Sequence, residues 1–245
     1  MTEDAFLGGA LKILQPRRGY RAATDPVLLA AACPAQRGDR VLDVGCGVGT
    51  AGLCLAKRVA GVSVEGVELQ EALAALSRRN AARNGVGAWL AHACDIREPP
   101  LFVRSVSYDQ VITNPPYHSA EAGVASPDMV KDRANRETMS LAAWLDFCLR
   151  RLRPGGAVTL IHRVERLPEI LAALEGRAGG VGVLPLAPRA ARPAKRVIVT
   201  AVKESRAPFR LAAPLALHAG ADGDDAAPFT PEAEAALRHG AALSV

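Results

Sequence analysis

Long apolar runs are missing from this sequence of 245 residues. The longest one, Val27 to Cys33, is far shorter than the roughly 20 apolar residues that a membrane-spanning helix needs. The first four residues include two acids and lack the basic-then-apolar order of a signal peptide. We therefore expect a cytoplasmic protein that does not associate with a membrane, and the length fits one large domain.

Cysteines in metal-binding pairs are also missing, and aromatic residues are few. The five cysteines are odd in number and lie mostly inside apolar segments, which predicts reduced thiols and neither disulfides nor a metal site. Two tryptophans, three tyrosines and five phenylalanines are the only aromatic residues. An aromatic residue in a loop of this chain is therefore less readily explained as filling of the core.

A strong excess of one charge is absent, although the basic residues cluster. The net charge is +5 and the isoelectric point is about 9.2, a moderate bias that favours a polyanionic partner without requiring one. The clusters lie near the N-terminus, on a predicted helix and in a proline-rich segment: Arg17, Arg18, Arg21, Arg78, Arg79, Arg189, Arg192, Lys195 and Arg196. Such clusters are either ordinary solvated surfaces or contacts to the phosphates of a nucleic acid.

Short apolar strands alternate with helical periods from Arg40 onward. This order predicts an α/β fold with a doubly wound, seven-stranded and mostly parallel sheet, whose last strand is antiparallel. The expected strands are 41–44, 62–67, 88–93, 108–113, 157–162, 181–186 and 197–202, and the expected helices are 25–33, 51–59, 70–84, 138–152, 167–174 and 231–237. We expect a single domain over 1–245, with an N-terminal element (1–37) that contacts substrate, a catalytic core (38–203) and a C-terminal extension (204–245).

A glycine-rich turn, Asp43-Val44-Gly45-Cys46-Gly47-Val48-Gly49, joins the first of these strands to its helix. Glycines at this place let the backbone approach a ligand at the carboxyl edge of the sheet, although a merely tight connection would use them too. A dinucleotide-binding turn has its third glycine three residues after the second. Here Thr50 occupies that place and the third glycine is Gly49, which argues against a dinucleotide.

Two acids follow the next two strands. Glu68 ends the second strand, 19 residues after Gly49, where a carboxylate would accept hydrogen bonds from ribose hydroxyls. Asp95 follows the third strand, where it would either receive the amino group of an adenine or serve its own turn. The glycine turn and the two acids together predict a nucleoside pocket.

This arrangement resembles the class I S-adenosylmethionine-dependent methyltransferases over about residues 20 to 203. The resemblance implies the Rossmann-like methyltransferase fold, and S-adenosyl-L-methionine as cofactor. It implies a cofactor site made of the following residues: Thr24, Asp25, Asp43, Gly45, Cys46, Gly47, Gly49, Glu68, Leu69, Asp95, Ile96 and Asn114.

The tetrapeptide Asn114-Pro115-Pro116-Tyr117 follows the fourth strand. Two prolines end the strand in a stiff, extended loop that can hold an amide beside an aromatic ring. In methyltransferases of this fold, the motif marks enzymes that act on a planar nitrogen. The resemblance implies that the Asn114 side-chain oxygen and the Pro115 carbonyl accept the two amino hydrogens, while Tyr117 stacks on the substrate. The predicted catalytic residues are therefore Asn114, Pro115, Pro116 and Tyr117.

The stretch from Gln15 to Asp25, with the apolar residues after it, is similar to the N-terminal element of one subgroup. That subgroup is the bacterial tRNA adenine-N6 methyltransferases that modify the adenosine beside the anticodon of a valine tRNA. The subgroup has Gly-Thr-Asp where this chain has Ala23-Thr24-Asp25. Thr24 and Asp25 would either close over the methionine part of the cofactor or cap the helix that follows. The resulting hypothesis is methyl transfer to the N6 amino group of an adenine in tRNA, which the basic segments hold.

Other functions share parts of this pattern. A glutamine N5-methyltransferase of proteins uses the same tetrapeptide but carries a helical domain before the glycine turn, and only about 40 residues precede Val41 here. Ribosomal RNA and DNA adenine methyltransferases differ mainly in added recognition elements. In other classes, an NAD-dependent oxidoreductase conflicts with the glycine spacing, and a non-catalytic nucleotide-binding module conflicts with the complete tetrapeptide. The sequence leaves the particular RNA and the oligomeric state open.

Overall fold

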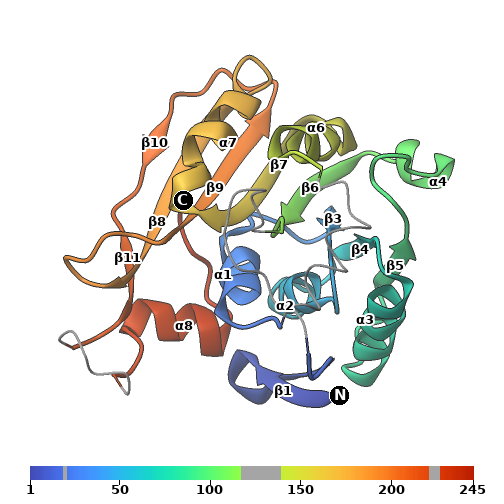
Figure 1. Cartoon of the computed structure of the whole chain (residues 1–245), viewed down its shortest axis with the longest axis horizontal. Coiled ribbons are helices and arrows are strands. Elements are labelled where there is room, and N and C mark those ends of the chain that lie inside the picture. Colours follow the sequence, from blue (N-terminus) through green and yellow to red (C-terminus); the bar gives the residue numbers. More distant parts are fainter. Residues whose placement is uncertain (19–20, 117–138, 221–226) are drawn as a thin grey trace.

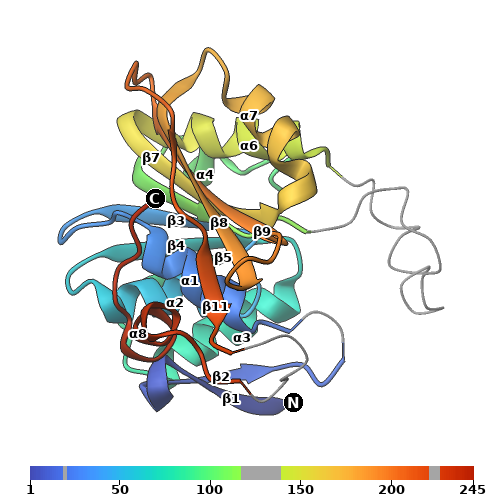
Figure 2. The same cartoon turned by 90° about the vertical axis from the view of Figure 1, so that its left-hand side faces the viewer.

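The computed structural model describes residues 1–18, 21–116, 139–220 and 227–245 as a sheet with helices packed on both faces (Figures 1 and 2). The main sheet has the strand order β10-β8-β9-β7-β6-β3-β4-β5, and β11 also pairs with β8. The strands are β3 (Arg40–Val44), β4 (Ser63–Glu68), β5 (Trp89–Ala93), β6 (Tyr108–Thr113), β7 (Leu152–Arg163), β8 (Ala178–Arg189), β9 (Arg196–Lys203), β10 (Arg210–Leu211) and β11 (Leu215–His218).

The seven predicted strands are present, and their directions confirm the predicted fold class. Strands β3 to β7 pair in parallel, whereas β9 is antiparallel to both of its neighbours, β7 and β8. In the described part of the chain the sheet has nine strands, two more than predicted, because β10 and β11 add to β8. Both are short, with two and four residues, and therefore carry little periodic signal.

Apolar side chains of each central strand alternate between two clusters, one on each face. In β3, Val41 belongs to the cluster of α1, α2 and α8, and Leu42 to the cluster of α6 and α7. Strands that are buried on both faces have nearly continuous apolar sequences. Short apolar runs in the sequence therefore located these strands. The helices are α1 (Thr24–Ala32), α2 (Thr50–Arg58), α3 (Glu71–Arg83), α4 (Leu101–Arg104), α6 (Leu141–Arg151), α7 (Leu167–Leu174) and α8 (Pro231–His239), with short 3₁₀ turns η1 (Leu7–Gly9) and η2 (Val164–Arg166).

An N-terminal hairpin is a feature that the sequence did not predict. Strands β1 (Thr2–Phe6) and β2 (Leu11–Gln15) pair antiparallel, with Thr2 opposite Gln15. The side chains of Leu11 and Ile13 are fully buried in the cluster that contains α1 and α2. The hairpin thus covers part of one helical layer (Figure 2).

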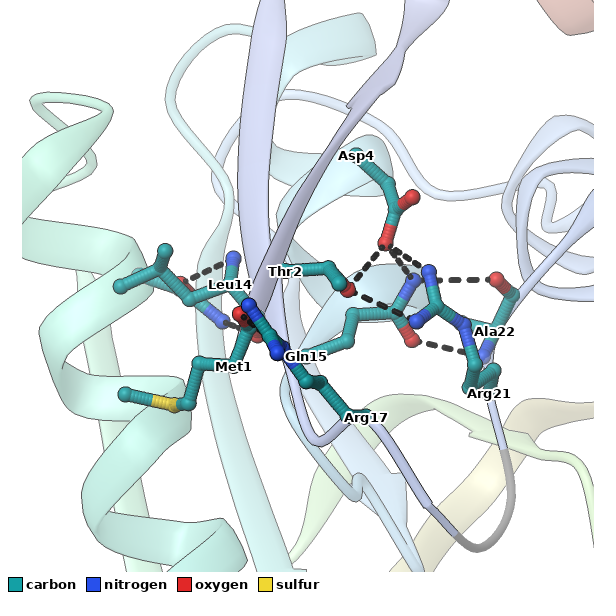
Figure 3. A network of polar contacts seen from close by, with 9 residues as sticks. Met1, Thr2, Asp4, Leu14, Gln15, Arg17, Arg21 and Ala22 are labelled. Carbon is teal, nitrogen blue, oxygen red and sulfur yellow. Dashed lines mark hydrogen bonds and ion pairs between the residues drawn. The ribbon is translucent and has the colours of Figure 1, made fainter.

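A polar network ties the hairpin to the segment before α1 (Figure 3). The buried Gln15 amide donates to Asp4 Oδ2 (3.0 Å) and to the Ala22 carbonyl (3.1 Å), and its oxygen accepts from the Ala22 N–H (2.8 Å). Arg21 forms an ion pair with Asp4 and donates to the Thr2 hydroxyl at 2.7 Å. These bonds fix the entry of the chain into α1.

Among the described residues, no helix is long and apolar enough to cross a membrane.

Candidate active site

Four adjacent strands bring the predicted site residues to one edge of the sheet. Because β6, β3, β4 and β5 are parallel and in register, the residues that follow their carboxyl ends lie side by side. Gly45 follows β3, Glu68 ends β4, Asp95 follows β5 and Asn114 follows β6. In doubly wound sheets this edge is where ligands bind.

The glycine turn after β3 needs its glycines for two different reasons. Gly45, Gly47 and Gly49 all have positive φ angles of 72°, 54° and 88°, which L side chains rarely adopt. A Cβ on Gly45 would also lie 3.0 Å from the ring of Trp144, whereas nothing lies within 4 Å of a Cβ on Gly47. The turn is therefore packed from behind at Gly45 and open at Gly47, as the close approach of a ligand requires.

Two buried carboxylates brace this turn. Asp43 Oδ2 accepts from the Gly52 N–H at 3.0 Å, at the start of α2. Burial raises the pKa of Asp43 to about 7, the Gly52 hydrogen bond opposes the rise, and the charge of Glu68 adds to it. Glu68 accepts from the Gly47 N–H through Oε2 (3.0 Å) and from the Gln70 N–H through Oε1 (2.9 Å). Each carboxylate oxygen can accept a second hydrogen bond, so Glu68 can still receive hydroxyl groups of a ligand.

Cys46 lies in the glycine turn, and its thiol points toward the sheet. A Cβ on Gly66 of β4 would lie 2.6 Å from the Cys46 sulfur, so the thiol fills the space that Gly66 leaves. Burial, followed by the charges of Asp43 and Glu68, raises the pKa of this thiol well above its ordinary value. The five cysteines are unbridged, as predicted.

Asp95 is engaged by a close neighbour in the sequence. Its carboxylate forms an ion pair with the Arg97 guanidinium (2.6 Å) and accepts from the Arg97 N–H (2.9 Å). The hydrogen bond from the Arg97 side chain is the main cause that lowers the pKa of Asp95.

Two apolar residues flank Glu68 and Asp95: Leu69, which is 53% exposed, and Ile96, which packs against the core. Leu69 therefore presents an open apolar surface beside Glu68.

Asn114 begins the loop after β6 and is half-buried, next to a buried Pro115 and an exposed Pro116. Thr113 donates from its hydroxyl to the Val44 carbonyl (2.8 Å) and accepts from Trp144 Nε1 (2.9 Å). The first bond joins the ends of β6 and β3, and the second joins β6 to α6. Tyr117, which is predicted to stack on the substrate, lies outside the described residues.

Trp144 is a residue that the sequence prediction missed. Its ring contacts the position of Gly45 while its indole N–H holds Thr113, so one side chain supports both the glycine turn and the loop of Asn114. The available signal was its rarity, since the chain has only two tryptophans. Its position on α6, more than 25 residues beyond Asn114, gave no local indication of the contact.

The two N-terminal site residues, Thr24 and Asp25, lie at the start of α1. Helix α1 begins at Thr24 after Ala23 and has no side-chain capping bond, so the interpretation of Thr24 or Asp25 as a cap is wrong. Asp25 is buried and forms an ion pair with Arg196, the first residue of β9. The structure thereby brings together one predicted cofactor residue and one member of a predicted basic cluster.

Comparison with known proteins agrees with this geometry. The family model of the methyltransferase small domain matches residues 23–165, which include the glycine turn, both acids and Asn114. The chain belongs to the methyltransferase small domain family. S-adenosyl-L-methionine is the cofactor of this methyltransferase, and the open side of Gly47 and the spare acceptor capacity of Glu68 fit a nucleoside.

Curated relatives and a solved structure extend the comparison. The methyltransferase is 31% identical over 196 residues to the tRNA1(Val) (adenine(37)-N6)-methyltransferase of Dickeya chrysanthemi, covering 77% of this chain and 75% of that protein. A protein of the same name from Tolumonas auensis is 31% identical, with 70% and 71% covered. For three further relatives of that name, the match spans 57% to 65% of their length. A crystal structure of a predicted O-methyltransferase from Agrobacterium tumefaciens has a TM-score of 0.72 and 27% identity, covering 90% of this chain and 99% of that one.

No group of three or more His, Cys, Asp or Glu residues in the described part of the methyltransferase could hold a metal ion.

Proposed function

We propose that this methyltransferase transfers a methyl group from S-adenosyl-L-methionine to the exocyclic N6 amino group of an adenine in a tRNA. The observation that carries the proposal is the position of Asn114-Pro115-Pro116 at the sheet edge that also presents the glycine turn and Glu68. Methyl donor and amino acceptor would thus meet at neighbouring strand ends. The tRNA as substrate class is supported by the names of the curated relatives.

The cofactor would lie along the carboxyl ends of β3, β4 and β5. Glu68 would accept hydrogen bonds from the ribose hydroxyls, while Leu69, Asp95 and Ile96 would border the adenine. The open backbone of the glycine turn would face the methionine part, while Asp43 holds the Gly52 N–H at the start of α2. Thr24 and Asp25 would close this part of the site from α1. When bound, the cofactor supplies an electrophilic methyl group on a sulfonium sulfur.

The acceptor would be held by Asn114 and Pro115. The Asn114 side-chain oxygen and the Pro115 carbonyl would accept the two amino hydrogens and so aim the nitrogen lone pair at the methyl group. Pro115 and Pro116 keep this loop extended, and Tyr117 would stack on the base. Alignment of this kind can contribute about 7 to 11 kcal/mol toward a reaction barrier, so no strong base is needed. A base drawn out of its stack gains about 1 to 3 kcal/mol from one aromatic partner.

The tRNA would approach from the same edge. Arg163 of β7 lies opposite Arg196 of β9, and β8 runs antiparallel to β9, so the segment 189–196 lies at the carboxyl edge. Arg192 and Lys195 of this segment are exposed. We assign phosphate contacts to them and to the exposed Arg17 and Arg18, which follow the N-terminal hairpin.

Three other members of the predicted basic clusters form ion pairs with acidic residues of the protein. Arg21 pairs with Asp4, Arg196 pairs with Asp25, and Arg78 pairs with Glu71 and donates to the Ala91 carbonyl. We therefore leave these three arginines out of the proposed RNA contacts.

The deciding experiment incubates the protein with methyl-labelled S-adenosyl-L-methionine and total RNA from a strain that lacks its gene. The label should appear in tRNA as N6-methyladenosine after nuclease digestion. Label in protein alone would instead indicate the glutamine N5-methyltransferase. Label on a ribose oxygen would indicate O-methyl transfer, and either result would contradict the proposal.

A further inference from the structure

Two asparagines, Asn80 on α3 and Asn84 at its C-cap, dock the N-terminal hairpin. Asn80 accepts from the Leu14 N–H (2.9 Å) and donates to the Leu14 carbonyl (3.1 Å). Asn84 forms the same two bonds with Lys12, both at 2.9 Å. Each side-chain amide thus pairs with one residue of β2 as a neighbouring strand would.

The two amides differ in their remaining hydrogen bond. Asn80 also donates from Nδ2 to the carbonyl of Val48, in the glycine turn, at 3.0 Å. Asn84, at the C-cap of α3, donates instead to the carbonyl of Asn80 at 2.8 Å. Asn80 is fully buried, whereas Asn84 is half-buried. Of this pair, Asn80 is therefore the one that joins the hairpin to the turn.

The orientation of the Asn80 amide depends on the hairpin. An amide has two N–H donors, and here Leu14 and Val48 each accept from the nitrogen while the oxygen accepts from the Leu14 N–H. If the Asn80 amide rotated by half a turn, its oxygen would face the carbonyls of Leu14 and Val48. Both carbonyls would then lack a donor, which costs free energy. Ser77, one turn earlier on α3, supports the same turn, because its Cβ lies 3.1 Å from the Cβ position of Gly49.

We propose that Asn80 is a positioning residue for the cofactor, and that it makes the N-terminal hairpin a working part of the cofactor site. Asn80 holds the Val48 carbonyl and so sets the backbone of Gly47 and Gly49 on either side of it. The docked hairpin holds Asn80 in turn. This inference rests on the proposed function only for the identity of the cofactor.

The first test compares Asn80→Ala with its matched control Asn84→Ala. Both variants lose two bonds to β2, but only the first loses the bond to the turn. Calorimetric titration with S-adenosyl-L-homocysteine should show about tenfold weaker binding for Asn80→Ala, as expected when a buried carbonyl loses its donor, and a change below about twofold for Asn84→Ala. In turnover assays, the KM for S-adenosyl-L-methionine should rise similarly, with kcat at saturation nearly unchanged. Equal losses in both variants, or no loss in either, would overturn the proposal.

A second measurement uses the unaltered protein and therefore does not depend on how Asn80→Ala folds. Hydrogen exchange followed by mass spectrometry should show that S-adenosyl-L-homocysteine slows exchange in peptides from residues 45–49 and also in peptides from residues 11–15. Slower exchange in the turn with no change in β2 would refute the coupling. Because neither binding measurement contains RNA, failure of the tRNA proposal would leave both results interpretable.

Discussion

Single residues at the site combine structural and chemical duties. Asp43 is buried and braces α2, Glu68 holds the glycine turn while keeping acceptor capacity, and Trp144 supports two loops at once. The sequence predicted Glu68 and Asp95 because each lies at or just after the end of a strand. It could not predict Trp144, because the contact joins segments that are far apart in the chain. The Asp95 carboxylate shows a mixed outcome, since its turn contact with Arg97 is present and its adenine contact stays a prediction.

Replacing Asn114 tests the proposed acceptor site. Asn114→Ala should lower kcat on tRNA about 100-fold or more, the usual effect of removing one oriented hydrogen-bonding group at a reacting centre. Steady-state assays with labelled cofactor would measure it. Full activity on RNA would refute the assignment, and Asn84→Ala serves as a control for an amide removed elsewhere.

Replacing Trp144 by Phe tests the support behind Asn114. Phe lacks the indole N–H, whose hydrogen bond to Thr113 is worth about 1 kcal/mol, and also the outer ring atoms that contact the position of Gly45. We expect a lower kcat and a weaker affinity for S-adenosyl-L-homocysteine, because the Asn114 loop loses its hydrogen bond and the glycine turn loses packing. Unchanged kcat and affinity, measured by steady-state assay and calorimetry, would contradict a supporting role of Trp144.

The raised pKa of Asp43 predicts a pH-dependent stability. A carboxyl with a pKa of about 7 in the folded protein and an ordinary value near 3.8 in the unfolded chain binds its proton more tightly when folded. Its contribution to the unfolding free energy is fully present below about pH 4 and is lost as the pH rises to 7, by up to about 4 kcal/mol. Urea unfolding at several pH values would measure this effect. The unfolding free energy of the natural protein minus that of Asp43→Asn should fall as the pH rises. A difference that grows with rising pH would contradict the shift.

At the scale of elements, periodicity located the strands and helices whose burial is regular. Tyr108–Thr113 was predicted with the observed bounds, and Glu71–Arg83 within one residue at each end. The hairpin β1–β2 was missed because its docking depends on Asn80 and Asn84, more than 60 residues away in the chain. The strand β7 was predicted too short, since it runs through Pro154-Gly155-Gly156, residues that usually indicate a break.

Two glycines with matched backbones test the role of the glycine turn. Gly47 and Gly85 both have positive φ angles, 54° and 65°, and a Cβ added to either would have no atom within 4 Å. Replacement by Ala should cost each variant about 1 kcal/mol of stability, as expected for Ala at a positive φ. Only Gly47→Ala should also weaken S-adenosyl-L-homocysteine binding, because its Cβ would enter the space of the ligand. Equal binding by both variants in calorimetry would place the cofactor elsewhere.

At the scale of the whole molecule, the order of strands was predictable and the surface was not. Alternating strands and helices specify a doubly wound sheet, and two strands in succession at the end specify the antiparallel β9. The ion pairs of Arg21 and Arg196 could not be deduced from the sequence, since their acids, Asp4 and Asp25, lie on other elements. The basic clusters therefore had to be sorted by their observed ion pairs.

Salt dependence tests the proposed RNA face. Removing two exposed charges in Arg18→Ala/Lys195→Ala should weaken tRNA binding and reduce the slope of log affinity against log salt by about two units. Lys57→Ala is the control, because Lys57 is exposed at the end of α2, away from the carboxyl edge. Filter binding between low and high salt would measure the slopes. An unchanged slope in the double variant would remove these residues from the RNA face.

The contact between the first and the last elements has a consequence for biosynthesis. At Gly8, in the turn of the hairpin, a Cβ would lie 2.9 Å from the Arg238 carbonyl oxygen in α8. The hairpin is synthesised before α8, and all the strands of the main sheet lie between them in the sequence. The turn of the hairpin can therefore acquire its final packing only after α8 has been made, and until then its apolar face depends on the earlier helices for cover.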